Sequence, residues 1–276
     1  MPTVNVGAKP VDGPKVEPGT TIAAKVHGGL KHLVYAPESF GTGDPLPLLV
    51  FLHGAGESGS DPWDVRIQGV AKLAIPETDP GPTARLPSAP TELVRRSFVV
   101  LSPQNPGSSS WTSDATQQAL TATVKAYAAL PGVDERRVYL TGISMGGFGT
   151  FFQVSRAPEL YAAAVPVCGG GRAGMGAAIA TAGVPLWAWH GANDAVVPVS
   201  GSDAMIAEAK KASADPESLV RYTRVPQSPA RDPTWPTVGI PDMPGHASWV
   251  DAYESDSHGG GAALFTWMLA QAKPAE

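Results

Sequence analysis

The sequence predicts an α/β fold in which a mostly parallel β-sheet is flanked by helices on both faces. Short runs of apolar, strand-forming residues are typical of strands buried on both sides. Segments with helical spacing of apolar residues lie between several of these runs, and this alternation is typical of parallel sheets. The 276 residues, 43% of them hydrophobic, suffice for one sizeable core, so we expect a single domain over residues 1–276.

The expected strands begin with a hairpin. Residues 20–37 alternate in polarity and are interrupted by Gly28 and Gly29, which predicts two antiparallel strands joined by a turn. Six later runs are expected to form strands: 47–54, 98–103, 138–142, 163–167, 186–191 and 220–225.

Helices are expected between the strands. Leu120, Val124 and Tyr127 recur at helical spacing before Pro131-Gly132, and residues 201–214 and 260–272 also have helical patterns.

Two segments rich in proline and polar residues, 76–90 and 226–245, are expected to be loops, and long ordered loops are often functional. For residues 76–90, a surface insertion without a role is an equally good interpretation. The loop 226–245 leads to His246, which favours a functional role.

Composition narrows the classes of function. A net charge of −5 gives no basic footprint, so we expect neither nucleic acid nor a membrane as a partner. The single cysteine, Cys168, excludes an internal disulfide. No apolar run approaches the length of a membrane span. The first residues lack the pattern of a signal peptide, yet a secreted domain without its leader would look the same, so both a cytoplasmic and a secreted location stay open.

The segment "VYLTGISMGGFGT", residues 138–150, contains a motif typical of a nucleophile. Gly142, Ser144 and Gly146 fit the pattern G-x-S-x-G, and the strand before it and helix after it are the context that this motif requires. The glycines permit close packing at a sharp, strained turn, and the helix amino terminus favours negative charge at the hydroxyl. We interpret Ser144 as a nucleophile; the alternative for the motif alone is an ordinary glycine-rich turn.

A serine nucleophile needs a base, and the base needs an orienting group. Asp194, in "WHGANDAVVP", follows the strand 186–191, where a carboxylate can orient a base. The alternative is an aspartate that supports its own turn.

Two histidines, His246 and His258, lie between the last expected strand and the last expected helix. Topology does not separate them, but Trp249 and Tyr253 can wall a site around His246. His53 and His190 end strands as "HG" pairs and are expected to order the loops that follow.

Acyl transfer also needs backbone N–H groups for the oxyanion. One donor is expected at Met145, directly after the nucleophile. The second is expected in the loop "HGAGESG", where Gly54 and Gly56 flank Ala55 and allow close approach; Ala55 is the first choice and Gly54 the alternative. No G-K-[ST] motif follows these glycines, which excludes a phosphate-binding P-loop.

Taken together, the order of "LLVFLHGAGESG", "VVLSPQNPGSSSW", "VYLTGISMGGFGTFF", "AAAVPVCGGG", "PLWAWHGANDAVVPV" and "GHASWVDAY" resembles α/β-hydrolase fold serine esterases. The types that it resembles are feruloyl esterases, polyhydroxybutyrate depolymerases and predicted peptidases. The resemblance covers residues 45–271. The chain departs from the family pattern at Ser58, where many relatives carry arginine, and in the proline-rich segment before His246.

The resemblance implies Ser144 as nucleophile, Asp194 as acid and His246, rather than His258, as base. It also implies that Trp111 lies near the substrate cleft; the alternative is a core tryptophan. Trp249, Phe148 and Trp235 are further candidates to line the substrate site. Aromatic walls would suit feruloyl-type or other aromatic esters, or a polyester.

The expected activity is therefore hydrolysis of a small-molecule or polymeric carboxylic ester through an acyl-enzyme. No metal or organic cofactor is expected, because the sequence has no clustered His/Cys spacing for zinc. The alternatives are a serine peptidase with the same triad and a non-catalytic binding protein on this fold. The sequence does not identify the natural ester or the oligomeric state.

Overall fold

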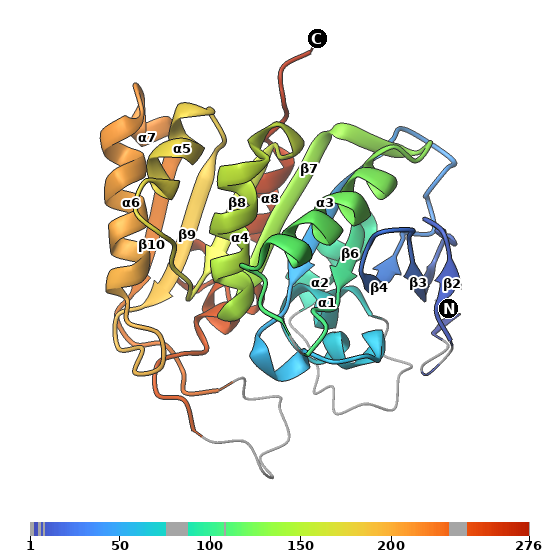
Figure 1. Ribbon diagram of the computed structural model, residues 1–276, viewed down its shortest axis with the longest axis horizontal. Coiled ribbons are helices and arrows are strands. Elements are labelled where there is room, and N and C mark those ends of the chain that lie inside the picture. The colour runs from blue at the N-terminus through green and yellow to red at the C-terminus, as the bar shows by residue number, and fades with distance from the viewer. Residues whose placement is uncertain are drawn as a thin grey trace.

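The computed structural model describes residues 3–4, 7, 9–75, 88–107, 109–231 and 242–275. Within these residues, strands are formed by β1 (Thr3–Val4), β2 (Val11–Asp12), β3 (Thr20–Lys25), β4 (Lys31–Tyr35), β5 (Leu46–Leu52), β6 (Val99–Pro103), β7 (Val133–Ile143), β8 (Ala163–Val167), β9 (Leu186–Gly191) and β10 (Val220–Val225). They form one sheet in the order β1-β3-β4-β6-β5-β7-β8-β9-β10, with β2 paired to β3 (Figure 1).

The sheet is mostly parallel, as predicted. All pairs from β6 through β5, β7, β8 and β9 to β10 are parallel. The predicted hairpin is present as the antiparallel pair β3–β4, and β4 pairs antiparallel with β6. Since parallel strands end at the same edge, the loops after β5, β7, β8 and β9 meet there.

Helices cover both faces (Figure 1). The α-helices are α1 (Gly69–Ala74), α2 (Ser88–Ser97), α3 (Asp114–Ala128), α4 (Met145–Arg156), α5 (Met175–Thr181), α6 (Ser200–Ala212), α7 (Pro216–Leu219) and α8 (Ala262–Leu269). Short 3₁₀ helices are η1 (Ala55–Glu57), η2 (Pro62–Ile67), η3 (Pro158–Leu160) and η5 (Ser257–Gly259), and η4 (Val250–Glu254) is a π-helix. Helices α3–α6 lie on the near face and α1, α2 and α8 on the far face. None of the described helices is long and apolar enough to cross a membrane.

Strand β5 shows why the sequence runs are continuously apolar. Leu48, Val50 and Leu52 pack into the core under α3–α6, whereas Leu49 and Phe51 pack into the core under α1, α2 and α8. All five side chains are buried, because successive residues of a strand point to opposite faces and both faces are covered.

Several predicted boundaries differ from the structure. The end of the predicted loop 76–90 is helical, because residues 88–90 form the first turn of α2, where Pro90 costs little. Strand β7 begins at Val133 rather than 138, because Val133 and Asp134 pair with Leu46 and Pro47 across a register shift. Helices α6 and α8 are shorter than the predicted segments 201–214 and 260–272. Residues 76–87, and residues 232–241 of the predicted loop 226–245, lie outside the described residues.

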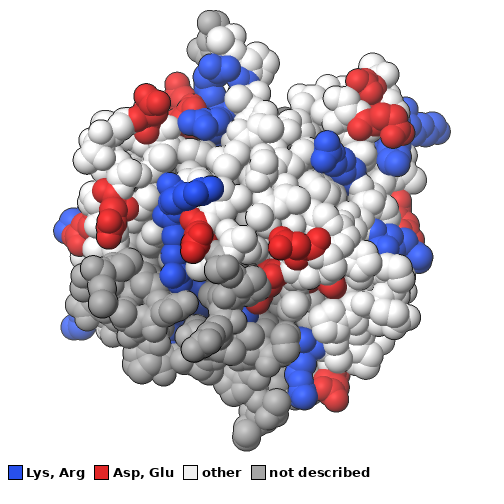
Figure 2. Space-filling model, turned by 180° about the vertical axis from the view of Figure 1, so that it is seen from behind, with Lys and Arg blue, Asp and Glu red and all other residues white. Residues whose placement is uncertain are grey.

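The face opposite to that of Figure 1 carries Lys and Arg interspersed with Asp and Glu. Figure 2 shows a run of Lys and Arg left of the centre of this face, with Asp and Glu beside it.

Candidate active site

Ser144 stands at a sharp turn between β7 and α4. Its backbone has φ 52° and ψ −116°, in the region where L-residues are strained. Its N–H donates to the Val167 carbonyl at 3.0 Å and approaches the Cys168 thiol at 3.2 Å. These contacts from the end of β8 hold a half-buried hydroxyl above the sheet edge.

The glycines around Ser144 are required by close backbone packing. A Cβ on Gly142 would lie 2.5 Å from the Gly146 carbonyl oxygen, and one on Gly146 would lie 2.0 Å from the Leu52 carbonyl oxygen. A Cβ on Gly147 would overlap the Val167 carbonyl oxygen. Side chains at these positions would therefore push α4 away from β5 and β8.

The structure brings Ser144, His246 and Asp194 into one hydrogen-bonded chain. The Ser144 Oγ lies 2.9 Å from His246 Nε2, and His246 Nδ1 lies 2.7 Å from Asp194 Oδ2. The three residues come from the turn after β7, the loop after β9 and the segment before η4. His258 does not join them, because it lies exposed on η5.

The side chain of Asp194 is buried and held by several hydrogen bonds. Its Oδ1 accepts hydrogen bonds from the Val196 and Val197 amides at 2.8 and 2.9 Å. Burial alone would raise the pKa of this carboxyl, but hydrogen bonds from His190, His246 and Val197 outweigh burial and hold its pKa well below the ordinary value. Asp194 is therefore an anion over the whole neutral range.

The two expected oxyanion donors are each the first residue of a helix. Met145 begins α4 and Ala55 begins η1, and first-turn amides have no acceptor within their own helix. The loop that carries Ala55 passes beside Ser144, because a Cβ on Gly54 would lie 3.8 Å from the Ser144 Cβ. Both amides are thus placed on elements that meet at Ser144.

Trp111 holds the loop that follows β5 through contacts with His53. Its indole N–H donates to the His53 carbonyl at 3.0 Å, and its ring meets the His53 ring edge-to-face at 5.2 Å. His53 in turn bonds the Gly54 carbonyl and accepts from the Asn105 amide. Trp111 is completely buried, so in this structure it lies in the core and not on an open cleft wall.

The other aromatic candidates differ in exposure. Trp249 is buried with its ring edge-to-face against His246, at a centroid distance of 5.6 Å. Phe148 is half-buried in the first turn of α4, beside Gly170. Trp235 lies outside the described residues. Phe148 is therefore the described aromatic candidate that is not fully buried.

Buried polar contacts tether the segment that carries His246. Ser228 donates to Asp251 at 2.8 Å, and Tyr253 bonds Thr141 on β7. Lys72 on α1 forms a buried ion pair with Glu254 at 2.9 Å. Sequence reasoning did not find Lys72 or Glu254, because neither residue belongs to a local motif.

Glu57 is a second buried acid that sequence reasoning missed. It is 2% exposed, and neither carboxyl oxygen has a hydrogen-bond partner within the described structure. Burial raises the pKa of Glu57 to about 7. The sequence signal that could have indicated its burial is that Glu57 is the one acidic residue in the glycine-rich segment "HGAGESG".

The free energy of unfolding should therefore fall as pH rises, because Glu57 must ionise in a buried position. The unfolded carboxyl ionises near pH 4.5 and the folded one near pH 7, so folding loses stability as pH rises between these values. We expect Glu57→Gln, which cannot ionise, to gain about 3 kcal/mol relative to the parent protein between pH 4.5 and pH 8. Urea unfolding of both proteins at the two pH values measures this, and a stability difference independent of pH would contradict it.

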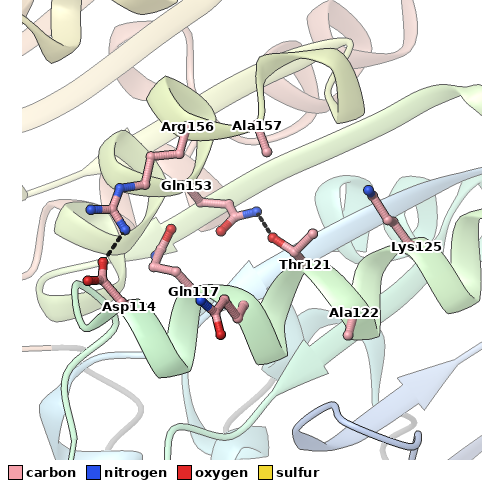
Figure 3. A pocket seen from close by; sticks show the side chains of 9 residues that line it. Asp114, Gln117, Thr121, Ala122, Lys125, Gln153, Arg156 and Ala157 are labelled. Atoms are coloured by element: carbon pink, nitrogen blue, oxygen red, sulfur yellow. Dashed lines mark hydrogen bonds and ion pairs between the residues drawn. The ribbon is translucent and has the colours of Figure 1, made fainter.

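A separate hollow of about 560 Å³ lies on the surface between α3 and α4 (Figure 3). An ion pair between Arg156 and Asp114 and a hydrogen bond from Gln153 to Thr121 cross it. Arg156 is the last residue of α4, whereas Ser144 immediately precedes its first, so the Arg156 end of this hollow lies a helix length from Ser144. Among the described residues, no group of three or more His, Cys, Asp or Glu side chains is arranged to hold a metal ion.

Comparison with known proteins places this geometry in context. Residues 49–274 match the model of the Alpha/beta hydrolase family. Among solved structures, a thermostable esterase is 28% identical with a TM-score of 0.66, covering 92% of this chain and 63% of the esterase chain. Est1E from Butyrivibrio proteoclasticus is 14% identical with a TM-score of 0.51, covering 75% and 89%. An acylaminoacyl peptidase from Pyrococcus horikoshii is 16% identical with a TM-score of 0.50, covering 71% and 34%.

No curated protein sequence matches the chain. The chain spans less than two thirds of the thermostable esterase, and the likeness to Est1E and to the peptidase shows the fold alone. The family model, in contrast, covers most of the chain, from the middle of β5 to beyond α8. The chain therefore belongs to the alpha/beta hydrolase family.

Proposed function

We propose that the protein hydrolyses carboxylic esters through an acyl-enzyme on Ser144. The observation that carries this proposal is the continuous hydrogen-bonded chain from Asp194 through His246 to Ser144. A nucleophile, a base and an orienting carboxylate in this order are the parts that acyl transfer by a serine needs. The 28% identity to a thermostable esterase supports an ester as the substrate.

In the first half of the reaction, His246 Nε2 takes the proton of Ser144 as its Oγ attacks the ester carbonyl carbon. Asp194 holds the imidazole with Nδ1–H toward its carboxylate and stabilises the imidazolium that forms. The amides of Met145 and Ala55 donate to the oxyanion. His246 then protonates the leaving alcohol, and the acyl group stays on Ser144.

In the second half, water takes the place of the alcohol. His246 removes a proton from the water, whose oxygen attacks the acyl-enzyme, and then returns a proton to Ser144 as the acid leaves. The steps proposed for this chain thus use its own residues and water.

The acyl or alcohol group is proposed to be aromatic or polymeric, as in feruloyl-type esters or polyesters. Phe148 supports this proposal, because its half-buried ring lies four residues after Ser144 in the first turn of α4. An aromatic surface at this place favours flat, apolar substituents by stacking.

The test pairs esters with amides of the same acyl group, including short aliphatic, feruloyl and polyester substrates. We expect turnover of esters and much slower turnover of amides. An organophosphate should label Ser144 in the folded protein and abolish that turnover. A protein that is labelled nowhere and hydrolyses no ester would refute the proposal and favour a non-catalytic binding protein; faster amide turnover would favour a peptidase.

A further inference from the structure

Asp194 is shared by two histidines. Besides His246, the completely buried His190 at the end of β9 places its Nε2 3.2 Å from Asp194 Oδ2. The same Nε2 lies 3.0 Å from the Val197 carbonyl oxygen. On the other side of the ring, Nδ1 lies 2.8 Å from Ser202 Oγ on α6.

Both ring nitrogens of His190 therefore face oxygen atoms. Asp194 and the Val197 carbonyl can only accept, so Nε2 must carry a proton. Ser202 Oγ also lies 3.0 Å from the Gly169 carbonyl oxygen, which likewise can only accept. The Ser202 hydroxyl has one proton. When it donates this proton to the Gly169 carbonyl, Ser202 Oγ can only accept from His190, and Nδ1 must then also carry a proton.

His53 provides a contrast within the same protein. Its Nε2 accepts a hydrogen bond from the Asn105 amide at 2.9 Å, so this nitrogen carries no proton and the ring is neutral. Burial lowers the pKa of His53 to about 4, in agreement with that arrangement. No backbone N–H donates to either nitrogen of His190 in the described structure; the groups in contact are Asp194, the Val197 carbonyl and the Ser202 hydroxyl.

We propose that His190 is a doubly protonated imidazolium that forms a buried ion pair with Asp194 and positions its carboxylate for His246. The effect on catalysis rests on the proposed function. The charge of His190 and its ion pair with Asp194 are inferred from the contacts alone and do not depend on that function.

The consequence concerns the proton of His246. A carboxylate that is already paired with one cation attracts a second cation less strongly. Among the described residues, Asp194 is the charged group in contact with the His190 ring, whose nitrogens also contact Ser202 from α6 and the Val197 carbonyl from the loop. With His190 charged, the attraction of Asp194 for an imidazolium at His246 is weaker, and removing that charge should strengthen it.

The first test is direct. In ¹⁵N-histidine spectra, an imidazolium has two nitrogens of similar chemical shift, whereas a neutral ring has two well-separated shifts. We expect His190 at pH 7 to show the imidazolium pattern, with His53 and His32 as neutral references, because burial lowers the pKa of each to about 4. The spectrum of His190→Gln assigns the signals. A neutral pattern for His190 at pH 7 would overturn the proposal, and this outcome does not depend on any enzymatic activity.

The second test uses the pH profile of kcat/KM for an ester. His190→Gln keeps an N–H donor near Asp194 but removes the charge, so the midpoint of the acid limb should rise by about one pH unit. His32→Gln is the matched control, because His32 is equally buried but bonds Leu30 and Tyr127, away from the triad. Its midpoint should not move. An unmoved midpoint in folded His190→Gln would contradict the proposal; should that variant fail to fold, the spectrum of the parent protein decides.

Discussion

Ser144→Ala is expected to lower kcat for ester hydrolysis by about 10⁴- to 10⁶-fold while leaving the fold intact. In the proposed mechanism, the Ser144 hydroxyl is the group that bonds the substrate covalently, and His246 and Asp194 act in the attack only through it. Removing Oγ deletes one hydrogen bond to His246 at 2.9 Å and creates no clash. Ester turnover by purified protein, together with the thermal unfolding midpoint, measures both parts of this prediction.

Ser155→Ala provides the matched control. Ser155 lies in α4, the helix that Ser144 precedes, and its hydroxyl donates locally, to the Phe152 carbonyl. We expect Ser155→Ala to keep the activity of the parent protein. If folded Ser144→Ala keeps more than about a tenth of the parent kcat, where four or more orders of magnitude should be lost, the nucleophile has been wrongly assigned.

Gly146→Ala is expected to destabilise the protein by about 3 kcal/mol and to abolish most activity. The added Cβ would lie 2.0 Å from the Leu52 carbonyl oxygen and 2.7 Å from that of His53. Backbone atoms of a central strand cannot move aside as a flexible side chain can. Helix α4 must therefore shift, and Met145 and Ser144 shift with it. Urea unfolding and ester turnover of the same preparation report the two effects.

Gly43→Ala separates this clash from a general cost of replacing glycine. A Cβ on Gly43 meets no atom within 4 Å, and its backbone does not adopt a positive φ. We expect its stability to stay within about 0.5 kcal/mol of the parent protein. Equal stability of Gly146→Ala and Gly43→Ala would contradict the close packing of α4 against β5.

The parts of the site that the sequence could predict are those encoded locally. The turn around Ser144 is such a part, because strand, glycines, serine and helix follow one another within a dozen residues. Asp194 could be found from its place after an apolar strand. The choice of His246 over His258 needed the resemblance to known esterases, since both residues occupy the same interval between strand and helix.

The remainder depends on packing between distant segments. The fold buries three ionisable residues, Glu57, Lys72 and Glu254. The spacing of residues in the sequence does not predict that an ionisable side chain will be buried. The contact between His190 and Asp194 arises because the loop after β9 folds back over its own strand. Trp111 is the opposite case: the resemblance implied a place near the substrate cleft, but its side chain is enclosed by the core.

The Lys72–Glu254 pair restricts the routes by which this protein can change. Exchanging either partner alone breaks this buried ion pair, at a cost of about 3–5 kcal/mol, whereas exchanging both for apolar residues of similar volume can cost much less. In a library of single substitutions, most variants at position 72 or 254 would therefore be too unstable to be tested for activity on a new substrate. Paired randomisation of the two codons would recover that part of sequence space.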